Sequence, residues 1–352
     1  QLKRNKITHL IWNFGNGGME KVVSNLVKNN SKHYDVSLIV INKENDVNAL
    51  NSLNSKKINF IKRKKGSKNI LKLFKLYFVI IKNKPNIIHV HYYDLIKILK
   101  PLKMILNFKM ILTIHGMNDF DNNILHCDKI VTVSNTHYKH VKNFLINRNL
   151  DISKLSMVYN GIEISKKRND VAIDLNNLNL VCVGRLNHYQ KRQDVIIKYF
   201  SRLQKKYSNS KLSFFGLGDS ESLLRELTVK YNVSNNVYFR KSIGNKSLIK
   251  KLTNYSLMIS ASKEETFGLN IVESLSIGLP VLAFPAKSIK EIADSNPIAF
   301  FFKDEKSFLN KIDNEICNIT SDEKNRSIQT IKKTFHLNLM ISNYDKIYKK
   351  LI

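Results

Sequence analysis

Two glutamates on either side of a glycine-containing turn form the first candidate site. Glu265 and Glu273 stand eight residues apart, and the stretch between them begins TFGL. If a helix begins there, Glu273 lies about one turn inside it on the face toward Glu265, because residues three, four, seven or eight apart share a helix face. The backbone N–H groups of Phe267, Gly268 and Leu269 would then lie at the helix N-terminus, which attracts anions. An anion site between two carboxylates suits a ligand with a diphosphate and hydroxyl groups, such as a nucleotide sugar.

The spacing of the two glutamates is a weak signal by itself, because such pairs are common on solvated helices. The order of features from Met258 to Phe284 is more restrictive. A short apolar strand is followed by small residues, a glutamate, an aromatic-glycine turn, a helix, a Gly-x-Pro turn and a second strand. This order favours a ligand site over a chance pair.

Two cations lie beyond an earlier strand in the second half of the chain. Arg185 follows the predicted strand Leu180 to Val183, and Lys191 lies near the start of the predicted helix Gln193 to Lys206. Two cations beside a diphosphate would neutralise the charge that develops on it as it leaves. The neighbouring Arg192 is an alternative to Lys191 as the second cation.

The first half of the chain contains a glycine-rich loop and three strand-end histidines. Gly17 and Gly18 lead into a predicted helix, but the loop is not GxGxxG, so we do not predict a dinucleotide site. A tight turn is the alternative reading of this loop. His115 directly follows a predicted strand, while His89 and His91 end the preceding one and are equally consistent with core histidines.

The spacing of apolar runs predicts the elements that must position these residues. In the first half, short buried strands alternate with helical patterns such as Glu20 to Lys28 and Thr136 to Leu145, which predicts a doubly wound parallel sheet. Its predicted strands are Ile7 to Trp12, Val36 to Ile41, Ile58 to Ile61, Ile87 to His91, Met110 to Ile114, Ile130 to Val133 and Met157 to Tyr159.

The second half repeats the same plan after a polar stretch, Ser165 to Asn179, which we interpret as a linker. The predicted strands are Leu180 to Val183, Leu212 to Phe215, Val237 to Phe239, Leu257 to Ser260 and Pro280 to Ala283. The predicted helices are Gln193 to Lys206, Ser220 to Tyr231, Ser247 to Leu252 and Leu269 to Ile277. Ligands collect at the carboxyl ends of strands in such sheets, where the candidate residues stand.

Composition bounds the size and the partners of the protein. Its 352 residues suffice for two domains, and 43% of them are hydrophobic. Three cysteines form no paired framework, which indicates a reducing compartment. No apolar run is long enough to span a bilayer. The net charge of +30 indicates a polyanionic partner, either phospholipid or nucleic acid.

The positive charge is concentrated in one part of the first half. Val47 to Asn118 contains fifteen Lys or Arg residues against the single acidic residue Asp94. Within it, Ile70 to Lys84 predicts an amphipathic helix with an apolar stripe of Leu71, Phe74, Phe78 and Ile81 and interleaved lysines Lys68, Lys72, Lys75 and Lys82. Such a helix can lie in the headgroup layer of an anionic membrane. A helix whose stripe faces the core is the alternative, and the charge asymmetry favours the membrane.

Several of these motifs together resemble the family 4 (GT4) glycosyltransferases, retaining enzymes of the GT-B fold. The resemblance rests on the Met258 to Phe284 segment and on the phrases GGMEKVV, IIHVHYY, NGI, GRLNHYQK and FGLGD, and so covers most of the chain. It implies two Rossmann-like domains that face a central cleft. The acceptor-side domain would span residues 1–165, with the helix 337–352 packed back on it, and the nucleotide-sugar domain would span residues 166–336.

The resemblance also implies roles for individual residues. Arg185 and Lys191 would stabilise the leaving diphosphate, although their spacing is one residue longer than the family's usual GRLxxxK. Glu265 would lie near the transferred sugar and Glu273 would bind the ribose hydroxyls. His115 would line the cleft and bond sugar hydroxyls rather than act as a base.

The remaining implied donor contacts are mostly backbone contacts. Gly17 and Gly18 would approach the donor and acceptor sugars, and Gly216 would border the donor. Arg240 begins the loop, up to Ile243, that would hold the nucleobase. Thr266, Phe267, Gly268 and Leu269 form the donor loop, in which Thr266 replaces the glycine usual in EGFG.

We expect no metal or other cofactor. Asp119 and Asp121 form an Asp-x-Asp triplet, and carboxylates are good Mg²⁺ or Mn²⁺ ligands. Such a triplet holds a metal in GT-A glycosyltransferases, which have a different fold. Here Arg185, Lys191 and the helix N-terminus can supply the positive charge without a metal.

The resulting expectation is a metal-independent hexosyl-type transferase (EC 2.4 class). It would move a sugar from a nucleotide-diphosphate donor to a membrane-associated acceptor, such as a lipid-linked glycan, lipopolysaccharide or capsule precursor. We expect a cytoplasmic bacterial protein held peripherally on the inner face of the membrane, without a nucleic-acid partner. A basic nucleic-acid-binding protein and a non-catalytic GT-B scaffold are the alternatives.

Overall fold

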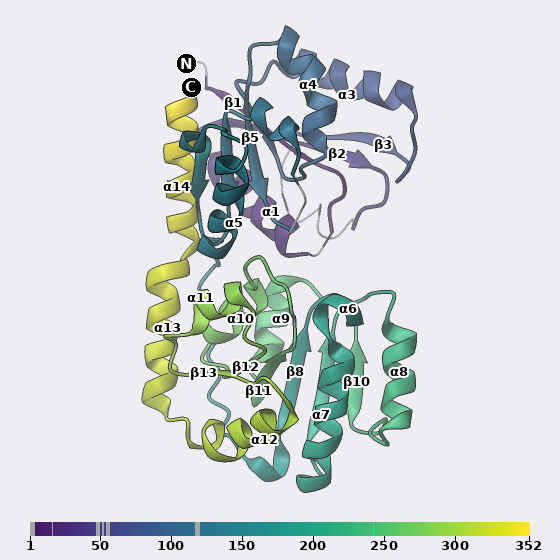
Figure 1. The fold of residues 1–352 in the computed structure, drawn as a ribbon, viewed down its shortest axis with the longest axis vertical. Helices are drawn as coiled ribbons and strands as arrows, with labels where there is room; N and C mark the ends of the chain where they lie inside the picture. Colours follow the sequence, from purple (N-terminus) through teal and green to yellow (C-terminus); the bar gives the residue numbers. More distant parts are fainter. Residues whose placement is uncertain are drawn as a thin grey trace. The chain divides into compact units, whose positions relative to one another are not determined.

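The computed structural model describes residues 4–15, 17–46, 50, 53, 57–116, 120–241 and 243–352. It divides the chain into two compact units. Unit 1 comprises Gln1–Gly161 together with Leu337–Ile352, and unit 2 comprises Ile162–His336. The stretch 165–179 therefore belongs to unit 2. Each unit is built around one parallel sheet with helices on both faces, as Figure 1 shows.

Unit 1 contains a seven-stranded sheet in the order β3-β2-β1-β4-β5-β6-β7, with every neighbouring pair parallel. All seven predicted strands are present. The first and the sixth begin and end one residue earlier than predicted, and the last does so two residues earlier. The order reverses between β1 and β4, which is where ligand sites form in such sheets. The strands are β1 (Lys6–Ile11), β2 (Asp35–Asn42), β3 (Ile58–Arg63), β4 (Ile87–Val90), β5 (Lys109–Ile114), β6 (Lys129–Thr132) and β7 (Leu155–Met157).

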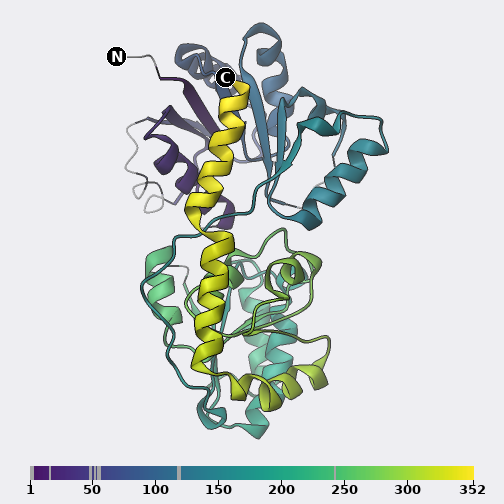
Figure 2. The same ribbon diagram turned by 90° about the vertical axis from the view of Figure 1, so that its left-hand side faces the viewer.

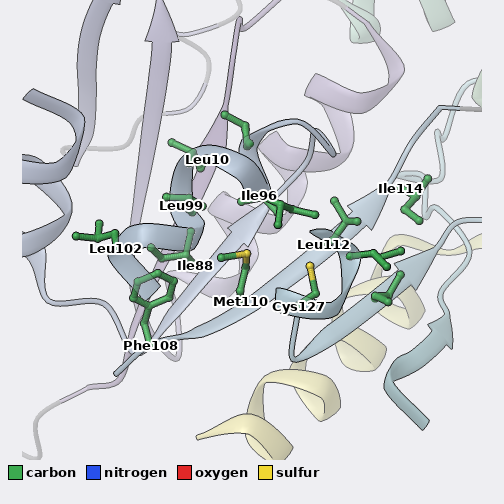
Figure 3. Close-up of a cluster of buried hydrophobic side chains, with 14 of the residues drawn as sticks. Leu10, Ile88, Ile96, Leu99, Leu102, Phe108, Met110, Leu112, Ile114 and Cys127 are labelled. Atoms are coloured by element: carbon green, nitrogen blue, oxygen red, sulfur yellow. The ribbon is translucent and has the colours of Figure 1, made fainter. Parts of the chain in front are cut away.

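Five described α-helices cover the sheet of unit 1. The helices α3, α4 and α5 contribute to one core cluster, and α1 and α14 lie against each other. Figure 3 shows part of that cluster, where Leu99 of α4 and Ile88 of β4 meet Met110 of β5. The helices are α1 (Gly18–Asn30), α3 (Ile70–Asn83), α4 (Leu95–Ile105), α5 (Asn135–Ile146) and α14 (Leu337–Leu351).

The C-terminal helix α14 is fixed to unit 1 by two buried tyrosines. Tyr348 bonds Nδ1 of His89 at 2.8 Å, and Tyr344 bonds the hydroxyl of Thr113 at 3.0 Å. Both tyrosine rings are fully buried. Figure 2 shows α14, in yellow, lying across unit 1. The last sixteen residues of the chain thus complete the core of the unit that begins it.

Unit 2 contains a six-stranded parallel sheet in the order β10-β9-β8-β11-β12-β13. Five of its strands are those predicted, and the sixth, β13 at Ala299–Phe301, was not predicted. Its order reverses between β8 and β11, the two strands that precede the candidate residues. The strands are β8 (Asn179–Val183), β9 (Lys211–Phe215), β10 (Val237–Arg240), β11 (Leu257–Ser260), β12 (Val281–Ala283) and β13 (Ala299–Phe301).

Two helices of unit 2 have a clear sequence signal for where they begin. Asp304 and Thr320 each form a capping box, in which the N-cap side chain and the side chain at the third helical position bond each other's backbone. The helices are α6 (His188–Lys191), α7 (Gln193–Lys206), α8 (Glu221–Lys230), α9 (Asn245–Leu252), α10 (Leu269–Leu275), α11 (Lys287–Ala293), α12 (Glu305–Asn314) and α13 (Ser321–Phe335). Among the described residues, no helix is both long and apolar enough to cross a membrane.

Candidate functional site

Two of the predicted site residues form an ion pair in unit 2. Nζ of Lys191, the last residue of α6, bonds Oε1 of Glu265, which lies in the loop between β11 and α10. The side chains are only 19% and 14% exposed, so water screens their attraction less than at the open surface. The backbone N–H of Lys263 also donates to the carbonyl of Gln190 at 3.3 Å. The loops that follow β8 and β11 are therefore joined by a side-chain and a backbone contact.

The structure distinguishes Lys191 from the neighbouring Arg192. Arg192 adopts a left-handed backbone conformation with φ of 52° between α6 and α7. Its guanidinium lies over the ring of Phe284, with Cζ 5.0 Å from the ring centre. Lys191 is the cation that reaches Glu265, while Arg192 packs on an aromatic ring.

Arg185 stands exposed just beyond the end of β8. Its backbone carbonyl accepts a hydrogen bond of 2.8 Å from Nε2 of Gln193, and Gln193 is fully buried at the start of α7. The first residue of α7 thus holds the backbone of Arg185, while the guanidinium projects from the surface of unit 2. This places a cation at the carboxyl edge of the sheet, in the loop that leads from β8 to α6, the helix that ends at Lys191.

Glycines let the loops after β8 and β9 touch. A Cβ on Gly216 would lie 1.9 Å from the carbonyl oxygen of Gly184, and one on Gly218 would lie 2.2 Å from that of Leu186. The N–H of Gly184 also donates a hydrogen bond of 3.0 Å to the carbonyl of Phe215, which joins the same two segments. Gly216 is therefore required by packing, and its contact with a donor stays a prediction.

Arg240 is the last residue of β10 and contacts Gly216. Its carbonyl accepts a 3.1 Å hydrogen bond from the Gly216 N–H. Its exposed guanidinium lies 5.1 Å from the ring centre of Tyr238. The predicted base loop from Arg240 to Ile243 includes Ser242, which lies outside the described residues.

The turn before α10 depends on Gly268. This residue has φ of +94°, a conformation that favours glycine, and a Cβ there would lie 2.6 Å from Cδ1 of Ile289. Helix α10 begins directly after it, at Leu269, and the side chain of Asn270 donates to the carbonyl of Val183 at 2.7 Å. The helix has seven residues, about two turns, and so ends two residues before the predicted Ile277.

The other members of the TFGL segment and Glu273 are held within unit 2. Phe267 is 2% exposed and meets Phe335 edge-on, with ring centres 5.5 Å apart. Glu273 is 5% exposed within α10, whereas Thr266 is partly exposed. The Ser288 hydroxyl donates to the carbonyl of Glu265, so the loop is supported from α11. The structure thus gathers Arg185, Lys191, Gly216, Arg240, Glu265, Thr266, Phe267, Gly268, Leu269 and Glu273 in unit 2.

The glycine loop of unit 1 lies at the start of α1. Gly17 is the N-cap residue and Gly18 the first helical residue, and both are exposed. A Cβ on Gly17 would lie 2.4 Å from Oε2 of Glu20, so this carboxylate folds back over the helix N-terminus. Glu20 is well placed there, because a negative charge stabilises the first turn of a helix.

Four histidines of unit 1 form a cluster that the sequence showed only in part. Nε2 of His115 lies 3.1 Å from Nδ1 of His91, and Nε2 of His91 lies 3.0 Å from Nδ1 of His9. His89 bonds Tyr348 through Nδ1 and the Thr113 hydroxyl through Nε2, at 2.8 and 2.7 Å. His9 was missed. Its signal was the pairing of β1 with β4, which sets His9 beside His89.

Burial keeps these histidines neutral. It lowers the pKa of His9 to about 3, and burial together with the nearby His137 lowers the pKa of His115 to about 3. Burial and the neighbouring histidines hold the pKa of His89 and His91 well below the usual 6.5. A general base works best with a pKa near the working pH, so His115 is suited to hydrogen bonding rather than to proton abstraction.

Among the described residues, three histidines could hold a metal ion, and the sequence offers the Asp-x-Asp triplet as a further candidate. Ring nitrogens of His9, His89 and His91 lie within 4.8 Å of one another. Both nitrogens of His89 bond Tyr348 and Thr113, and Nδ1 of His9 bonds Nε2 of His91, whose Nδ1 lies 3.1 Å from Nε2 of His115. A hydrogen-bond network thus uses all of these nitrogens except the buried Nε2 of His9, which has no hydrogen-bond partner among the described residues.

The second group is the Asp-x-Asp triplet. The carboxylate of Asp121 is taken by Tyr93, Asn123 and Lys97, the last at 2.9 Å. These partners hold the pKa of Asp121 well below its usual range. Asp119 lies outside the described residues. Asp121 therefore serves the local structure of its loop.

Comparisons with protein families match both halves of the chain. The family model described as Glycosyl transferases group 1 matches residues 163–333. The model described as Glycosyltransferase Family 4 matches residues 16–166. The two matches adjoin near the boundary between the two units.

Individual relatives span nearly the whole chain. An uncharacterized 41.2 kDa protein in the cps region of Klebsiella pneumoniae is 24% identical over 365 residues, which cover 95% of this chain and 96% of that protein. HepE of Anabaena, solved in complex with UDP and glucose, has a TM-score of 0.80 at 14% identity, with 98% and 99% of the chains covered. The lipopolysaccharide outer core galactosyltransferase WaaB has a TM-score of 0.73 at 16% identity, with 98% and 99% covered. At these identities, the structural likenesses establish the fold.

Proposed function

We propose that this chain, which belongs to the GT4-like glycosyltransferases of the GT-B fold, moves a hexosyl group from a nucleotide-diphosphate donor to a membrane-associated glycan acceptor with retention of configuration. The observation that carries the proposal is the pair of Lys191 and Glu265, which lies with Arg185 at the carboxyl ends of β8 and β11. This is the edge at which open α/β sheets bind their ligands. The retaining outcome, the donor class and the acceptor class are parts of the proposal.

In the proposed reaction, the bond between the anomeric carbon and the donor phosphate breaks as the acceptor hydroxyl forms the new bond from the same face. The acceptor proton passes to the leaving phosphate oxygen, so the protein need not supply a base. Arg185 and Lys191 stabilise the charge on the leaving diphosphate, and Glu265 keeps the ammonium of Lys191 in place. Catalysis then rests on positioning and on charges arranged in advance.

The two cations carry charge that a divalent metal carries in other diphosphate sites, so we propose a metal-independent transfer. Glu273 is proposed to bind the ribose, and the backbone at Gly216, Arg240 and Gly268 to approach the donor. In unit 1, His115 is proposed to bond hydroxyls of the transferred sugar as a neutral imidazole. The low pKa of His115 supports that role.

The donor and the acceptor can be narrowed by what the relatives are reported to do. HepE is described in complex with UDP and glucose, which makes a uridine nucleotide the first donor to test. The cps-region relative and WaaB favour an acceptor in the synthesis of capsule or lipopolysaccharide. The basic charge of this chain fits a bacterial enzyme that acts on the inner face of the cytoplasmic membrane.

The substitution Arg185→Ala tests the proposed diphosphate site. Loss of one charge-stabilising group should lower turnover on the order of 10²–10³-fold. The assay is release of nucleoside diphosphate from whichever nucleotide sugar stabilises the fold. Arg202→Ala is the matched control, because Arg202 is an exposed arginine of unit 2 whose Nε lies 3.3 Å from Glu305 on α12. A less than several-fold loss for Arg185→Ala would contradict the assignment.

A further inference from the structure

Helix α3 of unit 1 presents apolar side chains on two faces. Leu76 and Ile80 are 2% and 0% exposed and belong to the core beneath the helix. The four residues of the predicted apolar stripe, which we call the α3 stripe, are turned away from that core. Their exposed fractions are 72% for Leu71, 61% for Phe74, 65% for Phe78 and 46% for Ile81. The reading in which this stripe faces the core is therefore wrong.

The α3 stripe is continuous. Its members are spaced by three, four and three residues, which places them in one row along the helix. Single exposed apolar residues are ordinary on a soluble protein, but a continuous row marks an interaction site. In Figure 1, α3 lies beside α4, to which it is joined by a 2.6 Å hydrogen bond from the Tyr77 hydroxyl to the Ile98 carbonyl. Neither that helix nor the sheet covers the stripe.

The charge around the stripe is positive. Lys68, Lys75 and Lys82 are exposed and Lys72 is partly exposed on the same segment. Asp94, the single acidic residue between Val47 and Asn118, accepts hydrogen bonds of 2.9 and 3.0 Å from the Trp12 indole. Long lysine side chains beside an apolar row can bury their stems in lipid while their ammonium groups reach the phosphates.

The positive charge around the α3 stripe also indicates which partner binds it. A second copy of this chain would bring two rows of lysines together, and each copy carries a net charge of +30. An anionic bilayer satisfies both parts of the surface, because its headgroups pair with lysines and its acyl boundary accepts the phenylalanines.

We propose that the α3 stripe inserts into the headgroup layer of an anionic lipid bilayer and holds unit 1 on the membrane. Delivery of a lipid-linked acceptor through this contact rests on the proposed function, whereas the contact itself does not. The two are therefore tested by different measurements.

The test is cosedimentation of the full chain with vesicles of phosphatidylglycerol and phosphatidylcholine, compared with vesicles of phosphatidylcholine alone. The variant is Leu71→Ser with Phe74→Ser and Phe78→Ser, which changes exposed side chains only. Its partition onto the anionic vesicles should fall at least 10-fold. The control, Ile146→Ser with Leu339→Ser, changes two apolar residues of unit 1 that are 48% and 46% exposed on α5 and α14, and should bind as the unaltered chain does.

Several outcomes would overturn the proposal. One is equal binding of the unaltered chain to both kinds of vesicle. Another is binding of the triple variant to the anionic vesicles that equals that of the unaltered chain. A third is a triple variant that no longer self-associates but still binds the vesicles unchanged. An unchanged thermal unfolding midpoint shows that the variant is folded. A chain that binds vesicles through the stripe but transfers no sugar would contradict only the proposed function.

Discussion

At the scale of single residues, the most informative contact is that of Lys191 with Glu265. The sequence offered two adjacent cations, and their spacing could not choose between them. The structure separates them, because Lys191 closes the four-residue helix α6 and reaches Glu265, while the left-handed backbone of Arg192 turns its guanidinium onto Phe284. Of these two cations, Lys191 is the one that bonds a second predicted site residue.

Substitution of these two cations should therefore have unequal effects. Lys191→Met should lower turnover on the order of 10²–10³-fold, because it removes a charge that we propose stabilises the leaving diphosphate. Arg192→Asn should stay within several-fold of the unaltered chain, since asparagine tolerates the left-handed backbone found at this position. Steady-state release of nucleoside diphosphate measures both. A larger loss in Arg192→Asn than in Lys191→Met would reverse the assignment.

The absence of a side chain at Gly216 allows two loops of the candidate site to pack closely. Gly216→Ala would set a Cβ 1.9 Å from the Gly184 carbonyl oxygen, so the loops after β8 and β9 would have to separate. We expect a loss of about 1–3 kcal/mol in the free energy of unfolding, as for other overpacked substitutions. Urea unfolding measures this quantity.

The matched control is Gly244→Ala, because a Cβ there meets nothing within 4 Å. It should change the free energy of unfolding by no more than about 0.5 kcal/mol. Equal effects of the two substitutions would show that the close approach at Gly216 does not constrain the site.

At the scale of elements, alternation of short apolar runs with helical patterns was enough to predict both parallel sheets. Buried strands of parallel sheets are apolar along their whole length and easy to recognise. The strand β13 was the exception and was not predicted. The outward direction of the α3 stripe was favoured over a core-facing one by the charge asymmetry of its segment, and the exposure of Leu71, Phe74 and Phe78 confirms that direction.

Site residues could be predicted from the sequence at positions where the backbone geometry requires one residue type. Gly268 at a positive φ and Gly216 at a close approach are positions that glycine marks visibly. His9 could not be recognised in this way, because a histidine inside an apolar strand resembles an ordinary core residue. It joins His91 and His115 only through the pairing of β1 with β4.

The histidine cluster on β1, β4 and β5 predicts how stability depends on pH. In the folded protein the pKa of His9 and of His115 is about 3, whereas in the unfolded chain each is near 6.5. Below pH 6.5 the unfolded chain therefore binds more protons than the folded one, so stability rises with pH and is lost on acidification. The loss should approach about 1.4 kcal/mol per pH unit for each histidine that is fully protonated when unfolded.

Urea unfolding between about pH 7 and pH 5 measures this dependence above the range in which most carboxyl groups titrate. The free energy of unfolding should fall steadily below about pH 6.5. His115→Asn, which removes one of the titrating imidazoles, should reduce the slope. A free energy that stays level down to pH 5 would contradict burial of neutral histidines.

At the scale of the whole molecule, the two proposed functional surfaces belong to different units. The basic segment and the α3 stripe belong to unit 1, and the loops with Arg185, Lys191 and Glu265 belong to unit 2. Helix α14 returns the chain to unit 1 through Tyr344 and Tyr348. This arrangement suits an enzyme that meets its acceptor at a membrane with one unit and holds a nucleotide sugar with the other, as proposed.

Donor binding is the measurement that tests the proposed function most directly. Thermal unfolding of the full chain should be followed with UDP, GDP, ADP, dTDP and CMP, each with Mg²⁺ and with EDTA. A ligand at 100 times its dissociation constant stabilises the folded state by about 2.7 kcal/mol. We predict stabilisation by one nucleoside diphosphate, unchanged by EDTA and weakened by Lys191→Met. Absence of a shift with every nucleotide, together with salt-dependent binding of RNA, would contradict a nucleotide-sugar site and favour a nucleic-acid-binding role.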